Sequence, residues 1–340
     1  MFLMLAGLMG IAMVGSLVDF SSEPAGHDEI DDEPPPDGDD APRSIEGTPL
    51  DHITAGGGDT GDDLAGDGDD DDALAGDAGN DTLVGSADPD WLSGGDGDDQ
   101  LNGYEDNDTL QGGEGDDALW GDAGGDRLSG DAGNDTLAGG LDADWLSGGD
   151  GNDLLSGYED NDTLDGGEGD DTLYAGFGDD NLSGGGGADA LHGWDGSDTL
   201  DGGAGQDTLQ GGNGDDRLNG VEDPGTEGGA DDMRDYLNAG GGDDTLVAGA
   251  GDWATGGEGG DDFLIGGWLE ADAVPPTIAD YDATEDSILL LYDEAAHPDP
   301  DVTVEPSEAD PATMEVRLDG SVVDYVPKAE GLQAWDISLV

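Results

Sequence analysis

The feature that most constrains this chain is a nine-residue period that runs without a gap from Gly76 to Asn219. All sixteen nonapeptides carry Asp at the sixth place and Leu at the eighth, as in GDAGNDTLV, which begins at Gly76. Glycine is frequent at the first, second and fourth places, where it permits backbone conformations with positive φ. A register kept for this long predicts a solenoid whose repeats pack mainly against their neighbours.

The repeats match the pattern G-G-x-G-x-D-x-U-x, and over most of its middle the chain resembles the RTX, or haemolysin-type calcium-binding repeat, family. The resemblance implies an all-β fold, a parallel β-roll in which two nonapeptides make one coil and alternate units lie above one another. It also implies that calcium ions lie between stacked turns, bound by carbonyl oxygens and by the sixth-place Asp. Calcium takes 6 to 8 oxygen ligands, more than one turn can supply.

Each unit is expected to form a turn with its first six residues and a short strand with its last three, so that the eighth-place Leu points inward. Ca²⁺ is the expected bound ion. The unit Ala248 to Gly256 has Trp253 at its sixth place, so an incomplete site is expected there. The expected side-chain ligands elsewhere are Asp81, Asp90, Asp99, Asp108, Asp117, Asp126, Asp135, Asp144, Asp153, Asp162, Asp171, Asp180, Asp189, Asp198, Asp207, Asp216, Asp235, Asp244 and Asp262.

The charge of the chain favours cations and excludes other partners. Its formal net charge is -81, from 87 acidic and six basic residues. Nucleic acids and anionic membrane surfaces are bound through Lys and Arg, so neither is an expected partner. Inward Leu side chains, at about 2 kcal/mol each, do not offset the conformational entropy of so many ordered residues. Folding and calcium binding are therefore expected to be one event.

Composition divides the chain into four segments. Residues 1–18 are apolar and predict a signal or membrane-anchor segment, and residues 19–56 predict an acidic, Pro-rich linker. Residues 57–267 predict the roll, which is regular over 76–219 and interrupted over 220–229. Residues 268–340 predict a small antiparallel β domain, with strands in 277–291 and a hairpin centred on Asp319-Gly320.

Odd and even units, numbered from Gly76, are expected on opposite edges of the roll. Every odd unit has Gly at the fourth place, whereas four even units have Asp there, at Asp88, Asp106, Asp142 and Asp160. Asp costs roughly 1 kcal/mol in a left-handed conformation that Gly adopts freely. The odd edge is therefore expected to bind calcium more tightly.

Aromatic residues of the even units suggest a second surface feature. Tyr104, Tyr158 and Trp194 occupy second places, and Trp91 and Trp145 occupy seventh places that face outward. Exposed rings of this kind are typical of a binding stripe for a glycan or a partner protein. Gly85 to Trp120 and Gly139 to Tyr174 are near copies that lie 54 residues apart, and this duplication also explains the spacing of the rings.

The expected function is that of a calcium-binding secreted or surface-anchored protein, a structural or interaction module that folds on extracellular calcium. An enzyme is not expected, because the chain has no H-E-x-x-H or G-x-S-x-G motif and only 56 residues precede the roll. Two alternatives remain: an accessory or remnant of an exported RTX enzyme or toxin, and an adhesin that binds through the roll. The sequence leaves open whether residues 1–18 anchor the protein to a membrane, and it does not identify a protein or glycan partner.

Overall fold

The computed structural model describes residues 43–44, 61–66, 71–221, 234–266, 274–291, 300–327 and 332–339. The expected leader, residues 1–18, and most of the expected linker lie outside the described residues. In the part of the chain that is described, no helix has the length and apolar character needed to cross a membrane. The described residues all belong to one compact unit, Asp40–Val340.

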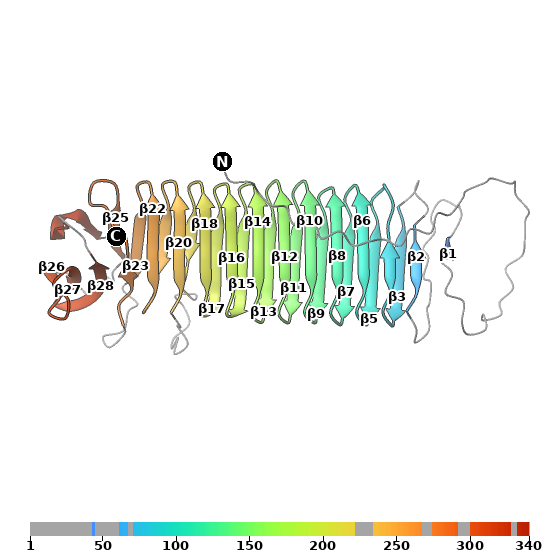
Figure 1. The fold of residues 1–340 in the computed structure, drawn as a ribbon, viewed down its shortest axis with the longest axis horizontal. Coiled ribbons are helices and arrows are strands. Elements are labelled where there is room, and N and C mark those ends of the chain that lie inside the picture. The colour runs from blue at the N-terminus through green and yellow to red at the C-terminus, as the bar shows by residue number, and fades with distance from the viewer. Residues whose placement is uncertain are drawn as a thin grey trace, which may run out of the picture. The chain divides into compact units, whose positions relative to one another are not determined.

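Two sheets of parallel strands form the roll, and successive strands alternate between them (Figure 1). Sheet A contains β1 (Arg43–Ser44), β2 (Asp63–Ala65), β4 (Thr82–Val84), β6 (Gln100–Glu105), β8 (Ala118–Ala123), β10 (Thr136–Leu141), β12 (Leu154–Glu159), β14 (Thr172–Phe177), β16 (Ala190–Asp195), β18 (Thr208–Asn213), β20 (Tyr236–Gly241), β22 (Trp253–Glu258) and β24 (Thr277–Ile278). Sheet B contains β3 (Ala73–Ala78), β5 (Trp91–Asp96), β7 (Thr109–Glu114), β9 (Arg127–Ala132), β11 (Trp145–Asp150), β13 (Thr163–Glu168), β15 (Asn181–Gly187), β17 (Thr199–Gly205), β19 (Arg217–Asn219), β21 (Thr245–Ala248), β23 (Asp262–Gly266), β25 (Ser287–Leu291) and β29 (Ile337–Leu339).

Strand pairing confirms the predicted parallel β-roll. Leu101 of β6 lies beside Leu119 of β8, one coil further along the chain. The same pairing continues across the interruption, where Leu209 of β18 lies beside Leu237 of β20. Two nonapeptides therefore make one coil, as the register of the repeats predicted.

The division of each unit into turn and strand differs from the expectation. Strand β6 covers the last three residues of one unit and the first three of the next, so that the turn contains only Asp106, Asn107 and Asp108. Strand pairing extends into the glycine-rich half because a positive φ at the second place, such as 125° at Gly113, bends the strand without ending the ladder. The short turn concentrates the fourth, fifth and sixth places at one edge.

The core is a double column of leucines between the two sheets. Every eighth-place Leu of the sixteen regular units is at most 1% exposed, and the seventh-place residues beside them face outward. Ala254 and Phe263 continue the column beyond Leu246, each 0% exposed. The inward direction of the eighth place is therefore confirmed.

The C-terminal segment extends the roll and adds a small antiparallel part. The two strands expected in 277–291 are present as β24 and β25, but they continue sheets A and B rather than pair with each other. The predicted hairpin around Asp319-Gly320 is confirmed: β26 (Val302–Pro306), β27 (Thr313–Leu318) and β28 (Ser321–Pro327) pair antiparallel. A short 3₁₀ helix, η1 (Ala334–Asp336), precedes β29, which pairs in parallel with β25.

Adjacent residues in β10 give a test of the register. We expect Leu137→Asp to abolish cooperative folding, because Leu137 is 1% exposed and the change buries a charge. Thr136 is exposed, so Thr136→Asp should cost less than about 1 kcal/mol. Thermal unfolding at saturating calcium measures both, and equal losses would contradict the inward and outward assignment.

Candidate metal centre

The sixth-place Asp side chains form one buried row along each edge of the roll. In the odd row, Oδ1 of Asp135 accepts a hydrogen bond of 2.7 Å from the backbone N–H of Asp117, one coil earlier. The carbonyl oxygen of Asp117 accepts another, of 2.9 Å, from the N–H of Thr136. Each Asp therefore bonds the preceding coil through its side chain and the next coil through its backbone.

The second carboxylate oxygen of these residues has no partner among the described atoms. A buried oxygen without a hydrogen bond is costly, and a cation is the simplest group that satisfies it. The unpartnered Oδ2 atoms belong to Asp81, Asp99, Asp108, Asp117, Asp126, Asp135, Asp144, Asp153, Asp162, Asp171, Asp180, Asp189, Asp198, Asp207, Asp216 and Asp244.

Glycine brings the backbone close to these carboxylates. A Cβ atom on Gly130, at a first place, would lie 2.2 Å from Oδ2 of Asp135 and 2.7 Å from the carbonyl oxygen of Gly148. First-place glycines have no positive φ, so close approach rather than the expected backbone conformation requires them. At the fourth place, Gly133 has a φ of 142°, and its Cβ would lie 1.8 Å from the carbonyl oxygen of Gly115. Carbonyl groups of successive coils thus stack directly beside the carboxylate row.

Burial makes the carboxylates of both rows hard to ionise. Desolvation, followed by the charges of neighbouring carboxylates, raises the pKa of Asp117 to about 7 and that of Asp144 to about 8, above the ordinary value of 3.8. Hydrogen bonds from the backbone oppose these shifts; their effect on the pKa is smaller than that of desolvation but larger than that of each neighbouring charge. A bound divalent cation would reverse the balance, because it supplies the opposite charge next to the buried oxygen.

The donor set fits a hard cation bound mainly by oxygen atoms of the backbone. Among the described residues, no group of three or more Asp, Glu or His side chains is arranged to hold a metal ion. A cation in these turns would therefore depend on carbonyl oxygens together with Oδ2 of the sixth-place Asp. Carboxylate and carbonyl oxygens are the ligands that Ca²⁺ prefers.

Three of the expected ligands differ from the rest. Asp90 is buried, but its Oδ2 accepts a 2.5 Å hydrogen bond from the N–H of Ser86, so its carboxylate is already satisfied. Asp235 is also buried in the row, and it differs in its spacing. Its Oδ1 accepts a hydrogen bond from the backbone N–H of Asp207, which lies 28 residues earlier. Asp262 is exposed and lies at a seventh place, so the sequence placed this unit one residue too late.

After Asp235 and Asp244, the next sixth places on the two edges belong to Asp252 and Asp261, which the sequence analysis missed. Asp235 donates from its N–H to Oδ1 of Asp252, and Asp244 donates to Oδ1 of Asp261, in each case across 17 residues. One residue is missing between Asp244 and Asp252, and this shifts the register that the sequence analysis assigned. The turn expected to lack an Asp because of Trp253 therefore has one, and Oδ2 of Asp252 accepts a 2.6 Å bond from the N–H of Gly249.

A second ladder, at the fifth place, was also missed. On the odd edge the side chains of Asn80, Asp98, Asp116, Asn134, Asn152 and Asp170 each accept a hydrogen bond of 2.8–3.2 Å from the backbone one coil later. The frequent Asn or Asp at the fifth place was the available signal. This ladder stabilises the turns of the odd edge without a metal ion.

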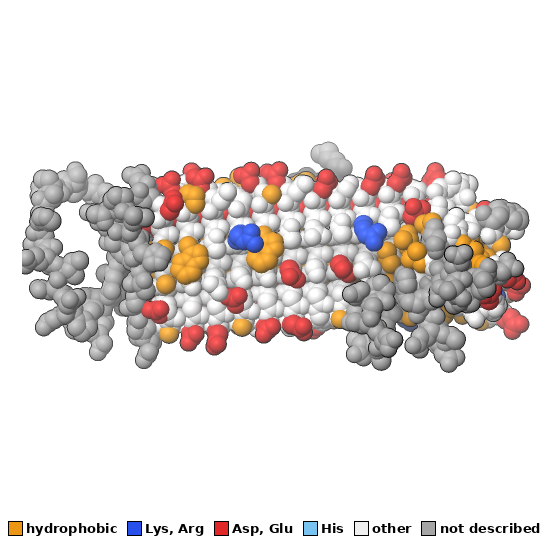
Figure 2. All heavy atoms as spheres, turned by 180° about the vertical axis from the view of Figure 1, so that it is seen from behind, with side chains coloured by type: hydrophobic (Ala, Val, Ile, Leu, Met, Phe, Trp, Pro, Cys, Tyr) orange, Lys and Arg blue, Asp and Glu red, His pale blue; other side chains and the backbone are white. Residues whose placement is uncertain are grey.

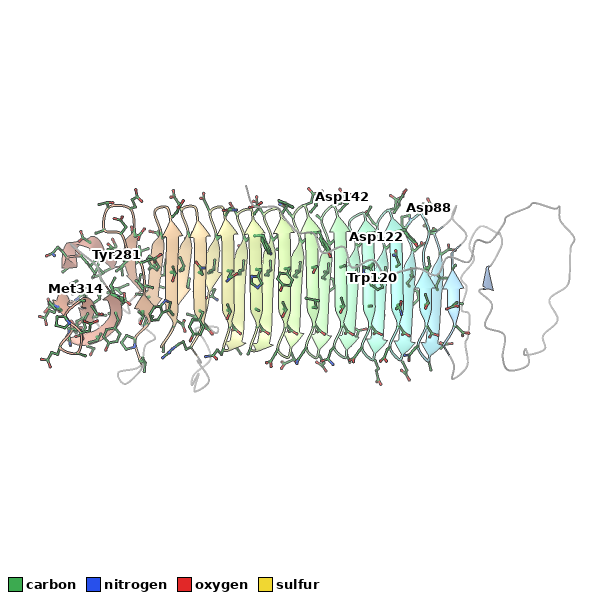
Figure 3. The ribbon with its side chains drawn as sticks, viewed as in Figure 1. Asp88, Trp120, Asp122, Asp142, Tyr281 and Met314 are labelled. Carbon is green, nitrogen blue, oxygen red and sulfur yellow. The ribbon has the colours of Figure 1, made fainter. Side chains whose placement is uncertain are left out.

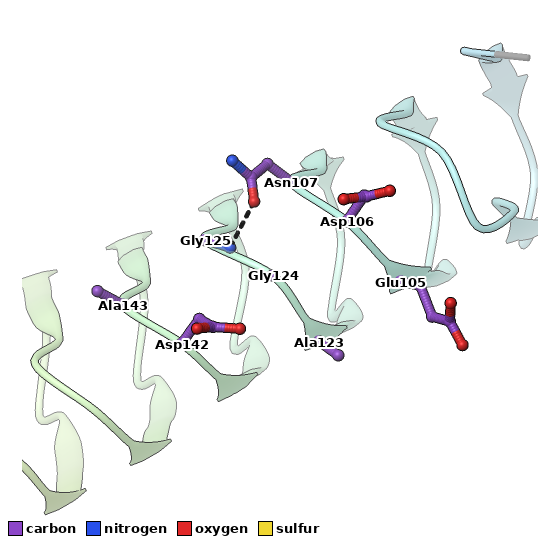
Figure 4. Close-up of a pocket in the computed structure, with 8 residues that line it drawn as sticks. All are labelled: Glu105, Asp106, Asn107, Ala123, Gly124, Gly125, Asp142 and Ala143. Carbon is purple, nitrogen blue, oxygen red and sulfur yellow. Dashed lines mark hydrogen bonds between the residues drawn. The ribbon is translucent and has the colours of Figure 1, made fainter.

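The even edge has an interrupted fifth-place ladder and an acidic hollow. Asn107 bonds the N–H of Gly125, but Gly125 has no side chain with which to continue the ladder (Figure 4). A hollow of about 590 Å³ opens there between Asp106 and Asp142. As expected, Asp106, Asp142 and Asp160 have left-handed backbones, with φ of 66° to 72°. Asp88 does not, so its turn lacks the expected strain.

The acidic side chains gather along the two long margins of the roll, with a sparsely charged face between them (Figure 2).

The model of the RTX calcium-binding nonapeptide repeat matches residues 75–110, 102–137, 138–173, 156–191, 165–200, 192–223 and 228–252, about half of the chain. The chain therefore belongs to the RTX calcium-binding repeat family. Repeats of this family bind calcium, which identifies the cation that suits these turns. A search of curated proteins found no match.

The raised pKa values predict a pH dependence of the calcium-free chain. Because the folded-state pKa values of about 6 to 8 exceed the ordinary 3.8, protons favour the folded chain. This stabilisation is complete below about pH 4 and is lost as the pH rises through 6 to 8. In chelator, circular dichroism should show more β structure at about pH 4.5 than at pH 8.

A matched pair of variants isolates the buried row in that experiment. Asp144→Asn should weaken the pH dependence, whereas Asp142→Asn should weaken it much less, because Asp142 is exposed and its charge is the smallest contribution to the raised pKa of Asp144. The same response from both variants would assign the pH dependence to the general charge of the chain.

Backbone strain at the fourth place predicts a stabilising substitution. Asp142→Gly should raise the unfolding midpoint at saturating calcium. Gly adopts the left-handed conformation freely, whereas it costs Asp roughly 1 kcal/mol. Asp88→Gly is the matched control, since it removes the same charge at a residue without positive φ. Calorimetry checks both, and a lower midpoint for Asp142→Gly would mean that its carboxylate contributes more than the strain costs.

Proposed function

We propose that the protein is a structural or interaction module that folds when its stacked turns bind calcium. The observation that carries the proposal is the row of buried Oδ2 atoms without partners, repeated along both edges. A site of this kind is part of the fold itself, because the same Asp carries both the bond between coils and the free oxygen. Calcium would neutralise the carboxylates and accept the carbonyl oxygens of two successive coils as ligands.

Several features of the chain support a role outside the cell. Sites built from two turns with only one carboxylate per unit suit the 10⁻⁴–10⁻³ M range of extracellular calcium modules. The apolar segment 1–18 supports export or anchoring at a membrane. The protein then crosses the membrane unfolded and folds outside. No catalytic motif was found in the sequence, which supports a module without enzymatic activity.

A calcium titration tests this proposal. At pH 8 the chain should lack β structure in excess chelator and gain it cooperatively at about 0.1 to 1 mM calcium. Circular dichroism follows the change, and resistance to protease reports the compact state. A β-rich, protease-resistant roll in chelator at pH 8 would overturn the proposal.

Magnesium provides the matched ionic control. It requires octahedral geometry at shorter distances and loses water reluctantly, so the same concentration should not fold the chain. If magnesium acts as well as calcium, the carboxylates respond to charge alone and the turns do not form defined sites.

A further inference from the structure

The aromatic residues of the even units lie on two opposite faces, not on one stripe. Trp91 and Trp145 are in sheet B, where Arg127 lies over Trp145 at 4.8 Å from the ring centroid. Tyr104, Tyr158 and Trp194 are in sheet A. Figure 3 shows the related positions Trp120 and Asp122, a ninth and a second place, on the outward side of sheet A.

The three aromatic residues of sheet A have strained backbones. Their φ values are 85° at Tyr104, 87° at Tyr158 and 79° at Trp194, a region that bulky residues rarely adopt. Most other second places in the regular repeats hold Gly or Asp, which tolerate that conformation better. Burial does not offset the strain, because Tyr158 and Trp194 are 56% and 55% exposed. Strain that the fold does not require is common at functional sites.

Tyr158 and Trp194 lie on either side of a glycine. Gly176 of β14 pairs with Tyr158 of β12 on one side and with Trp194 of β16 on the other. Adjacent strands are about 4.8 Å apart, so the two aromatic residues are about 10 Å apart along the sheet. A Cβ on Gly176 would lie 2.3 Å from the carbonyl oxygen of Tyr158, so this strand can place no side chain of its own at that position between the two aromatic residues.

Further rings and carboxylates surround this space. Two residues before Gly176, Tyr174 stacks on His192 with ring centroids 4.9 Å apart. One residue after it, Phe177 is 52% exposed and lies between Glu159 and Asp195 in the neighbouring strands. Strands β4 to β22 of sheet A contain no Lys or Arg. The face is thus aromatic and acidic, without a positive charge of its own.

We infer that Tyr158, Gly176 and Trp194 form a cage for a cationic side chain, an Arg or Lys of a basic segment in a partner protein. A cation between two ring faces is attracted by both, and Glu159 and Asp195 complement its charge. The separation of about 10 Å, twice the strand spacing, leaves room for one planar guanidinium between the rings. The acidic surroundings disfavour an anionic partner. The net charge of -81 steers a basic segment towards the roll.

Glycine substitutions separate binding from folding. Tyr158→Gly and Trp194→Gly should each weaken binding of an Arg-Gly repeat peptide at least tenfold, measured by calorimetry at saturating calcium and 0.15 M salt. Both should also raise the unfolding midpoint, because they relieve the positive φ. Rings that only support the fold would instead lower the midpoint when removed, which would overturn the inference.

Tyr104→Gly is the matched control. Tyr104 also occupies a second place with a positive φ, but the residue two coils further on is Gly140, so no second aromatic ring faces it. It should raise the midpoint and leave peptide binding unchanged. Equal binding by the unmodified chain, Tyr158→Gly and Trp194→Gly would mean that the peptide binds the carboxylates in general, and would overturn the cage. Equally tight, ring-dependent binding of a citrulline peptide, or of cellohexaose, would exclude a cationic occupant in favour of a neutral peptide or a glycan.

Discussion

The structure depends on the two oxygen atoms of one buried carboxylate. In most of the regular repeats, Oδ1 of the sixth-place Asp accepts a backbone bond from the preceding coil, while Oδ2 lies beside a glycine without a partner, as at Asp135 and Gly130. The first oxygen fixes the register between coils. The second leaves a negative charge in a buried place, which is unfavourable until a cation binds. Assembly of the coils and formation of the sites are therefore the same process.

Glycine completes this arrangement in two different ways. At the first place it lets the backbone approach the carboxylate, and at the fourth place it stacks carbonyl groups of successive coils, as at Gly115 and Gly133. Each nonapeptide thus contains both carboxylate and carbonyl oxygen ligands, and the parallel pairing of the strands repeats them along the roll. The two edges still differ, because the fifth-place ladder supports the odd edge and is interrupted at Gly125 on the even edge.

The repeats revealed most of the fold because each position has one invariant physical task. Leu must fill the column between the sheets and Asp must join the coils, so their spacing predicted the roll and the ladder residues up to Asp244. The later coils were harder, because one missing residue places Asp261 rather than Asp262 in the row. Strands β24 and β25 keep only part of the repeat pattern. Asp286 accepts a bond from the N–H of Asp261 and Ile288 points into the core, but the glycines of the repeat are absent before both strands, so the sequence pattern did not connect them to the roll. The fifth-place ladder was harder to recognise because that place holds either Asn or Asp in most units and a different residue, such as Pro89, Gly125 or Ala143, in others.

The step between bonded aspartates is not constant along the chain. It is 18 residues from Asp117 to Asp135, 28 from Asp207 to Asp235 and 17 from Asp235 to Asp252, yet each step has the same hydrogen bond. The ladder thus requires an Asp at the edge of each coil, but it does not fix the number of residues in the coil. Evolution can lengthen or trim individual coils in such a protein without disturbing the neighbours. Foreign peptides grafted after Val221, where the backbone bond from Gly220 to Val247 is kept, would be displayed from an otherwise unchanged scaffold.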